Sequence, residues 1–227
     1  MIFSKFGVKV GALMSSETGN RPRESHIPKS QLNFFELVSH LSEVKRQGWV
    51  DRGIENPESV AEHSFEVAVM SSFEAKRKGL DVQKTAMMAL IHDLSEIYAG
   101  DITPHQHLPE EQRAEAILNW VPPSDEALID KHKKEGEALK KITQRLPLEF
   151  RTSIMDLWRE YNDGQTEEAK LVYRMDKMQR LIQAKIYRDQ EPNFPINSFL
   201  EESLASNDPQ IRRLAKAIEK DIKSVSP

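Results

Sequence analysis

The sequence predicts an all-α fold, a bundle of helices that forms one domain. Apolar residues recur three and four positions apart from Gln31 onward, as at Phe34, Leu37 and Leu41, which is the spacing of one helix face. No window shows the sustained alternation of apolar and polar residues that is typical of a half-buried strand. A chain of 227 residues can bury the core of one domain without covalent support.

The first predicted helices have recognisable ends. The first helix begins its apolar face at Phe34 and should end near Gly48. The second should start at Asn56, a capping residue that is followed by Pro57, because proline suits the first helical position. It continues to Gly79, and its inner face carries Val60, His63, Val67 and Met70.

A third helix opens at Asp81 and runs to the pair His92-Asp93. Between 86 and 91 it is apolar on all sides, which predicts a buried helix. Later helices are predicted over 124–145, 147–161, 166–188 and 208–223, with Thr166 as a cap. The charged runs at 110–115 and 131–134 are predicted to be solvated helix faces.

The polar stretch before the first helix contains Gly19, Pro22 and Pro28. Such a composition does not bury enough apolar surface to fold by itself, so residues 1–30 are predicted to be a flexible leader. The helical domain is assigned to residues 31–225.

Composition excludes several classes of function. The chain has no cysteine, so any metal must be bound by nitrogen and oxygen, and no cysteine nucleophile exists. The formal net charge of −4 argues against binding to a nucleic-acid polymer, although a local site for a small anion can still be positive. No apolar run approaches the ~20 residues of a membrane helix. We therefore expect no membrane partner and a cytoplasmic protein.

The clearest candidate site lies at the end of the third helix. Burying the imidazole of His92 and the carboxylate of Asp93 among apolar residues is costly unless they are paired or bind a metal. His63 should point inward from the preceding helix. Glu96 follows one turn after His92, and Asp101 comes after a glycine at which the chain can turn back over the site.

Each of these residues has a simpler explanation when it is taken alone. The pair His92-Asp93 could be a capped helix end, and His63 could be a hydrogen-bonded core histidine. Two histidines and an aspartate that face one interior, however, form a site suited to a divalent metal with mixed nitrogen and oxygen ligands. The cluster therefore predicts a metal site.

Two longer segments resemble a known family. The runs RQGWVDRGIENPESVAEHS (46–64) and LIHDLSEIYAGDITP (90–104) are similar to the HD-domain 5′-deoxynucleotidases. The family pattern is Arg-x-x-Trp, Pro-Glu-Ser-Val-x-x-His, His-Asp-x-x-Glu and Gly-Asp-Ile, and this chain contains all four in order. The resemblance covers roughly residues 34–189, about two thirds of the chain. It implies an HD-domain helical bundle with a metal site in its centre, and an insertion near 105–130.

The resemblance implies a metal-dependent enzyme that removes the 5′-phosphate from deoxynucleoside monophosphates. Its ligands would be His63, His92, Asp93 and Asp176, holding one divalent ion, which could be Co²⁺, Mn²⁺, Fe²⁺, Mg²⁺ or Zn²⁺. Asp176 is supplied by the resemblance alone, because it lies at the flank of the apolar stripe of its helix. Members of this family are homodimers, so a homodimer is expected.

The resemblance also implies roles for the remaining motif residues. It assigns proton transfer near the nucleophilic water to Glu96, and the leaving 5′-oxygen side to Asp101. Arg46 is expected to clamp the phosphate with its fork of donors. Trp49 is expected to pack on the sugar, where a lack of room for a 2′-hydroxyl would favour deoxynucleotides. Two alternatives stay open: Glu96 could orient a metal ligand, and Trp49 could be ordinary core.

Two other functions compete with this interpretation. Another HD phosphohydrolase, such as a cyclic nucleotide phosphodiesterase or a guanosine tetraphosphate hydrolase, would share the ligands but should lack the set of Arg46, Trp49, Glu96 and Asp101. A non-catalytic, metal-stabilised nucleotide-binding scaffold is the second. The presence of Glu96 and Asp101 beside the ligands speaks against a scaffold, because a scaffold needs neither.

Overall fold

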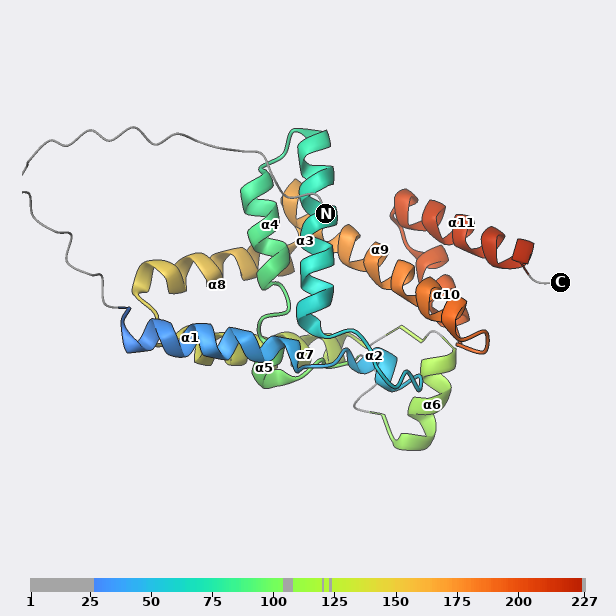
Figure 1. Cartoon of the computed structure of the whole chain (residues 1–227), viewed down its shortest axis with the longest axis horizontal. Helices are drawn as coiled ribbons and strands as arrows, with labels where there is room; N and C mark the ends of the chain where they lie inside the picture. The colour runs from blue at the N-terminus through green and yellow to red at the C-terminus, as the bar shows by residue number, and fades with distance from the viewer. Residues whose placement is uncertain (1–26, 104–107, 120, 123, 226–227) are drawn as a thin grey trace, which may run out of the picture.

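The structure is a computed structural model that describes residues 27–103, 108–119, 121–122 and 124–225. These residues form helices joined by short connections, and the one β-type pairing among them is an isolated bridge between Lys45 and Ser59 (Figure 1). The predicted all-α class is therefore confirmed. Most of the predicted leader, residues 1–26, lies outside the described residues, as do parts of the segment 105–130.

The first predicted helix is interrupted. Helix α1 covers Lys29–Ser39 and continues as a 3₁₀ turn, η1, over His40–Ser42. A separate short helix, α2, covers Gln47–Val50. The prediction of one helix up to Gly48 is therefore wrong.

The interruption is caused by a long-range backbone pairing. The N–H group of Arg46 donates to the carbonyl of Glu58 at 3.1 Å, and the N–H group of Val60 donates to the carbonyl of Val44 at 2.8 Å. Arg46 itself is extended, with φ −67° and ψ 107°. Because these groups are bonded to a distant segment, they do not continue a helical ladder, and Arg46 is held beside the start of the next helix.

Helix α3 covers Val60–Lys78 and begins at a capping box. The Ser59 hydroxyl accepts the N–H of Glu62 at 3.2 Å, and the Glu62 carboxylate accepts the N–H of Ser59 at 2.7 Å, so two free donors of the first turn are satisfied. The predicted start with Asn56 as the cap is wrong, because the preceding residues are held in the backbone pairing. The helix ends at Gly79, whose φ of 71° suits glycine.

Helix α4 covers Val82–Ile91 and packs along α3. Its predicted start is confirmed, since the Asp81 side chain accepts the N–H of Lys84 at 2.9 Å. The prediction that it is buried on all sides is wrong, because Met87 and Leu90 are 42% and 43% exposed. One face of α4 thus lies at the outside of the bundle.

The later part of the described chain contains four predicted helices and three shorter ones that were not predicted. The longer helices agree with the prediction within a few residues, and Thr166 caps its helix by accepting the N–H of Ala169 at 3.2 Å. The shorter ones span nine residues or fewer, too few for a clear periodic signal. The predicted helices are α7 (Asp125–Thr143), α8 (Leu148–Asp163), α9 (Glu167–Gln190) and α11 (Pro209–Val225), and the others are α5 (Glu96–Ala99), α6 (Glu110–Leu118) and α10 (Asn197–Ala205).

Helix α9 lies at the centre of the arrangement. Figure 1 shows it between the α3–α4 pair and the α10–α11 pair, and it contacts all four helices. One apolar cluster joins α9 to α3 and α4, a second joins its far end to α10 and α11, and a third joins α4 to α7 and α8. Among the helices of the described residues, none combines the length and the apolar character needed to cross a membrane.

Candidate metal centre

Four predicted ligand residues meet inside the bundle. His63 lies on α3, His92 is the C-cap of α4 with Asp93 next to it, and Asp176 lies on α9. One ligand atom each of His63, His92 and Asp176 lies within 4.8 Å of the other two. The Oδ2 atom of Asp93 is 3.3 Å from His92 Nε2 and 3.7 Å from His63 Nε2. The structure therefore places all four side chains within reach of one ion.

The hydrogen bonds of the two imidazoles leave one nitrogen of each ring available. His92 Nδ1 lies 2.6 Å from the carbonyl oxygen of Ala89, which can only accept, so Nδ1 carries the proton. His63 Nδ1 lies 2.7 Å from Gln179 Oε1. The Nε2 atoms of both rings are buried without a hydrogen-bond partner. Because an unpaired buried polar atom is costly, these two lone pairs fit a metal ion.

The two aspartates of the cluster are held in the ionised form. Burial by itself would raise the pKa of Asp176, but His63 and Lys177 outweigh it and hold that pKa well below its ordinary value. The pKa of Asp93 is likewise lowered by His92 in spite of burial. Ionised carboxylates offer only acceptor atoms, which suits a divalent cation. The structure thus brings Asp176, which the resemblance alone supplied, to 3.3 Å from His63 Nε2.

Three further predicted residues gather beside the cluster. Arg46 Nη1 lies 3.0 Å from Asp93 Oδ2, 3.3 Å from Asp101 Oδ1 and 3.7 Å from Glu96 Oε2. The Asp101 carboxylate also accepts the backbone N–H of Gln47 at 2.8 Å, which fixes its position. One guanidinium group is therefore shared by three carboxylates at the edge of the candidate metal centre.

Glu96 has the surroundings of a group that exchanges a proton. It is 1% exposed, and neither of its carboxylate oxygens has a hydrogen-bond partner. Burial and the neighbouring carboxylates of Asp93 and Asp101 raise the pKa of Glu96 well above its ordinary value. A carboxyl group tuned in this way keeps a proton under conditions in which an ordinary carboxyl group is ionised, which suits a group that transfers a proton.

Trp49 is mainly a core residue. It is 2% exposed, and its ring packs against Tyr187, Phe194 and Phe199 with centroid distances of 5.2, 6.1 and 4.8 Å. Its indole N–H donates to Glu58 Oε1 at 2.8 Å. Trp49 is also among the residues that line the cavity beside the candidate metal centre. It is therefore a packed side chain that forms part of a cavity wall.

That cavity has a volume of about 700 Å³. His92, Asp93 and Asp176 line it together with the residues around Arg46. Apolar side chains from α6, from the connection after it and from the first turn of α7 also line it, and these are Ala116, Ile117, Val121 and Leu128. One cavity thus joins a polar wall at the candidate metal centre to an apolar wall.

Sequence reasoning missed basic residues on the cavity wall. Lys131 belongs to a run that was predicted to be solvated, yet it lines the cavity, and the carboxylates of Glu135 and Glu96 raise its pKa although burial alone would lower it. Lys177 and Arg180 line the cavity from α9. A lysine or arginine at a helix flank is usually solvated, so the only available signal was that Lys177 adjoins Asp176.

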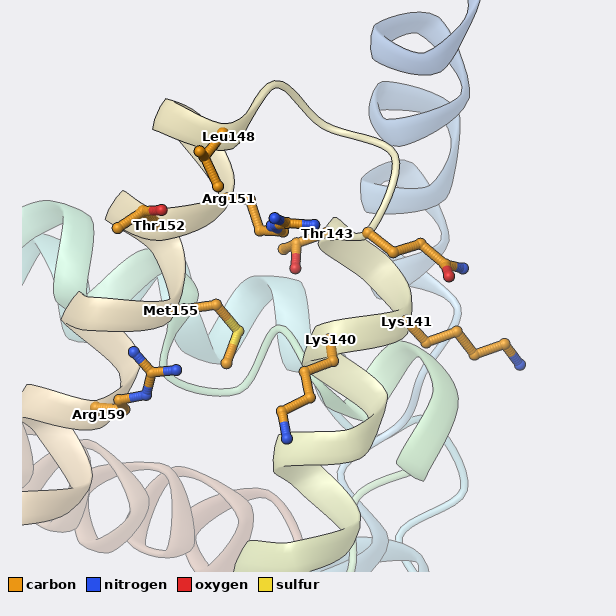
Figure 2. Close-up of a pocket in the computed structure, with 9 residues that line it drawn as sticks. Lys140, Lys141, Thr143, Leu148, Arg151, Thr152, Met155 and Arg159 are labelled. Carbon is orange, nitrogen blue, oxygen red and sulfur yellow. The ribbon is translucent and has the colours of Figure 1, made fainter.

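A second hollow, of about 510 Å³, lies between α7 and α8. Figure 2 shows the basic side chains of Lys140, Arg151 and Arg159 around it, together with Met155. No histidine or carboxylate lines this hollow. It therefore offers no metal ligands, and the candidate metal centre belongs to the larger cavity.

Comparisons with known proteins identify relatives of this chain. The family profile of the HD domain matches residues 38–219, a span that contains all the candidate site residues. Human 5′-deoxynucleotidase HDDC2 is 36% identical over 166 residues, which are 73% of this chain and 72% of that protein. The protein of the same name from Dictyostelium discoideum is 34% identical over 204 residues, 85% of this chain and 98% of its own. A conserved hypothetical protein from Pyrococcus furiosus, of known structure, has a TM-score of 0.57 at 28% identity, and the match covers 86% of this chain and 99% of that chain.

The convergence of the ligand atoms leads to a first prediction. Replacing His63, His92 or Asp93 with alanine should remove bound metal and abolish phosphatase activity, because each change deletes one atom of a small ligand set. Elemental analysis of the purified variants gives the metal content per chain, and circular dichroism reports whether they are folded. His40→Ala is the matched control, since that side chain is 58% exposed and pairs with Glu43 on the surface. Full metal content in two of the three variants would refute the site.

Proposed function

Since this chain belongs to the HD domain family, we propose that it is a 5′-deoxynucleotidase, a metal-dependent phosphohydrolase that removes the 5′-phosphate from deoxynucleoside monophosphates. The observation that carries the proposal is the position of Arg46 and Glu96 directly beside the buried histidine–aspartate cluster. The relatives named 5′-deoxynucleotidase, which match 73% and 85% of this chain, support the same activity. The enzyme would act in nucleotide metabolism.

The proposal includes one divalent metal ion. His63, His92, Asp93 and Asp176 would hold it. When bound, the ion would polarise a phosphoryl oxygen and lower the pKa of a water molecule that it binds. Two neutral imidazoles and two carboxylates suit Co²⁺, Mn²⁺, Fe²⁺, Mg²⁺ or Zn²⁺, and thiolate ligands are excluded because the chain has no cysteine.

The chain's own residues supply the remaining functions. Arg46 presents several donors in a planar fork, which suits the oxygens of a phosphate group. Glu96, whose pKa is raised by burial and by neighbouring carboxylates, would transfer a proton near the nucleophilic water. Asp101, held by the backbone of Gln47, would act on the side of the leaving 5′-oxygen.

The cavity supports a nucleoside as the rest of the substrate. A nucleoside monophosphate combines a charged phosphate with a flat and largely apolar base. The cavity likewise has a charged part and an apolar part. The metal-centre residues and Arg46 line the charged part, and Ile117, Val121 and Leu128 line the apolar part. In this proposal the predicted insertion near 105–130 contributes the wall for the base, and Trp49 contacts the sugar.

Two alternatives are less well supported. A cyclic nucleotide phosphodiesterase or a guanosine tetraphosphate hydrolase would need the metal ligands but not the grouping of Arg46, Glu96 and Asp101. A scaffold without turnover would gain nothing from Glu96, whose two buried oxygens lack hydrogen-bond partners. A cytoplasmic location is also part of the proposal.

We also propose that the protein is a homodimer, with a face of α3 as its interface. Phe65, Val69 and Phe73 are 64%, 54% and 71% exposed, and their spacing of four places them on one side of the helix. Large apolar side chains in a contiguous exposed row are unusual on a monomer. A row of this kind can pack against its own copy about a twofold axis.

The surroundings of Glu96 lead to a second prediction. Glu96→Gln should lower kcat by ~10²-fold or more, as expected for the loss of a general acid or base, while metal content and nucleotide affinity stay close to those of the parent. Steady-state kinetics and elemental analysis measure the two effects separately. Glu137→Gln is the control, because Glu137 lies on the exposed side of α7. If metal content falls in step with activity, Glu96 supports a ligand instead of transferring a proton.

The third prediction concerns the substrate. The efficiency kcat/KM should be at least ~10-fold higher for dAMP than for AMP, the order of discrimination that a shaped pocket achieves, and 3′-phosphates and cyclic diesters should be rejected. Trp49→Phe should reduce this ratio more than it slows dAMP hydrolysis. Trp158→Phe, in a different core cluster, should leave the ratio unchanged. Equal efficiency on dAMP and AMP in the parent would refute the substrate while leaving the metal-dependent phosphohydrolase in place.

The fourth prediction concerns the oligomeric state. The parent should elute as a dimer in size-exclusion chromatography with light scattering, and Phe65→Glu or Phe73→Glu should shift it to a monomer. Phe150→Glu, which places the same charge at a 58% exposed position of α8, should leave the dimer intact. A dimer that tolerates both α3 substitutions would show that the interface lies elsewhere.

A further inference from the structure

A buried chain of hydrogen bonds leads away from the first metal ligand. Gln179 lies on α9, one turn after Asp176, and is 1% exposed. Its Oε1 atom is 2.7 Å from His63 Nδ1. Its Nε2 atom donates to Glu58 Oε2 at 2.9 Å and to Glu66 Oε2 at 3.0 Å. All the polar atoms of this amide are therefore in use.

The direction of these hydrogen bonds follows from the groups involved. Carboxylates accept, so Glu58 and Glu66 require the NH₂ side of the Gln179 amide. The oxygen of the amide must then face His63, and an amide oxygen can only accept. The proton of the neutral imidazole is consequently on Nδ1, which leaves the lone pair of His63 on Nε2, facing the other ligands.

The hydrogen bond at the Trp49 end of this network also has a fixed direction. The indole N–H of Trp49 can only donate, and it occupies Glu58 Oε1 at 2.8 Å. The Glu58 carboxylate thus accepts on both oxygens, one from Trp49 and one from Gln179. The hydrogen bonds of Trp49, Glu58, Gln179 and His63 therefore converge on Glu58: Trp49 donates to it from the cavity wall, and Gln179 donates to it while accepting from His63.

We propose that Gln179 is a positioning residue that fixes His63 as the Nδ1–H tautomer and aims Nε2 at the metal, with Glu58 and Glu66 fixing the orientation of the Gln179 amide. The inference rests on the metal site of the proposed function. It also gives Trp49 a second role, because its N–H completes the acceptor set of Glu58. Outer hydrogen bonds of this kind orient a ligating imidazole and raise its affinity for metal.

The second histidine of the centre provides an internal comparison. His92 Nδ1 is bonded to the backbone carbonyl of Ala89, within its own helical turn. No side chain is needed to fix that tautomer. A change at Gln179 should therefore affect His63 and leave His92 as it is, which separates a specific effect from a general loosening of the site.

Two substitutions at Gln179 separate positioning from structural support. Gln179→Met keeps the length of the side chain but deletes the acceptor for His63. Gln179→Glu keeps an acceptor but sets a carboxylate against Glu58 and Glu66, which should lower the thermal stability of the metal-free protein. Gln190→Met, the same change at the exposed last residue of α9, is the control.

The readouts are metal affinity, tautomer state and thermal stability. In calorimetric titrations with Co²⁺, Gln179→Met should weaken binding by ~10- to 100-fold, the range seen when an outer partner of a ligand is lost. Gln179→Glu and Gln190→Met should stay within about threefold of the parent. In ¹⁵N–¹H spectra of the metal-free protein at alkaline pH, His63 should be the Nδ1–H form in the parent and a mixture in Gln179→Met, with His92 unchanged.

Three results would overturn the inference. One is a Co²⁺ affinity of Gln179→Met that equals that of the parent, another is an Nε2–H form of His63 in the parent, and the third is a metal affinity that simply follows thermal stability across the variants. None of these measurements uses a nucleotide, so the inference can fail while the 5′-deoxynucleotidase proposal stands. A parent that binds no Co²⁺ would instead overturn the metal site, and with it both proposals.

Discussion

The cost of burying unpaired polar atoms is the constraint on which the rest of this structure depends. The bundle encloses two imidazole nitrogens without hydrogen-bond partners, on His63 and His92, and both oxygens of Glu96 in the same condition. An apolar core that carried these groups for no purpose would lose stability for each of them. Their positions on three different elements, all turned toward one point, are accounted for when the point is a metal-binding site with a substrate beside it.

Helix α9 contributes polar side chains to the site and apolar side chains to the core. Residues three positions apart lie on neighbouring points of the same helix face, so Asp176 and Gln179 approach His63 from one side, one toward Nε2 and the other toward Nδ1. The same helix also carries Val172 and Leu181, which are fully buried. Packing of α9 against α3 therefore sets the position of His63 relative to its acceptor without a separate structural device.

The parts of the fold that local sequence determines could be predicted. Helix starts at Asp81, Ser124 and Thr166 depend on a side chain and an N–H group three residues away, and the structure shows each of these caps. The break before α2 depends on the pairing of Arg46 with Glu58, which no local window contains. The inward position of His63, in contrast, could be predicted, because helical periodicity is a local pattern of the sequence.

The residues of the candidate site also differ in whether local sequence was enough to predict them. Proximity in sequence was enough to group His92, Asp93 and Glu96, because they lie within two turns. Asp176 needed the family resemblance, since it comes more than eighty residues after His92 and its helix has a stronger apolar stripe elsewhere. Gln179 gave no sequence signal at all. A glutamine on a helix is ordinarily a surface residue, and its importance arises only from what α3 places opposite it.

Charge balance explains why a cation is needed where the phosphate would bind. Asp93, Asp101 and Asp176 surround the centre with negative charge, and Arg46 is the guanidinium group placed among them, close to Asp93 and Asp101. A phosphate monoester approaching these carboxylates alone would be repelled at distances where screening by salt is weak. A divalent ion held by the ligand set would reverse that field locally, and Lys131 and Lys177 on the cavity wall add positive charge along the approach. In the proposed enzyme, the same acidic residues that would repel an anion from the metal-free site would bind the ion, and the bound ion would then allow the anion to follow.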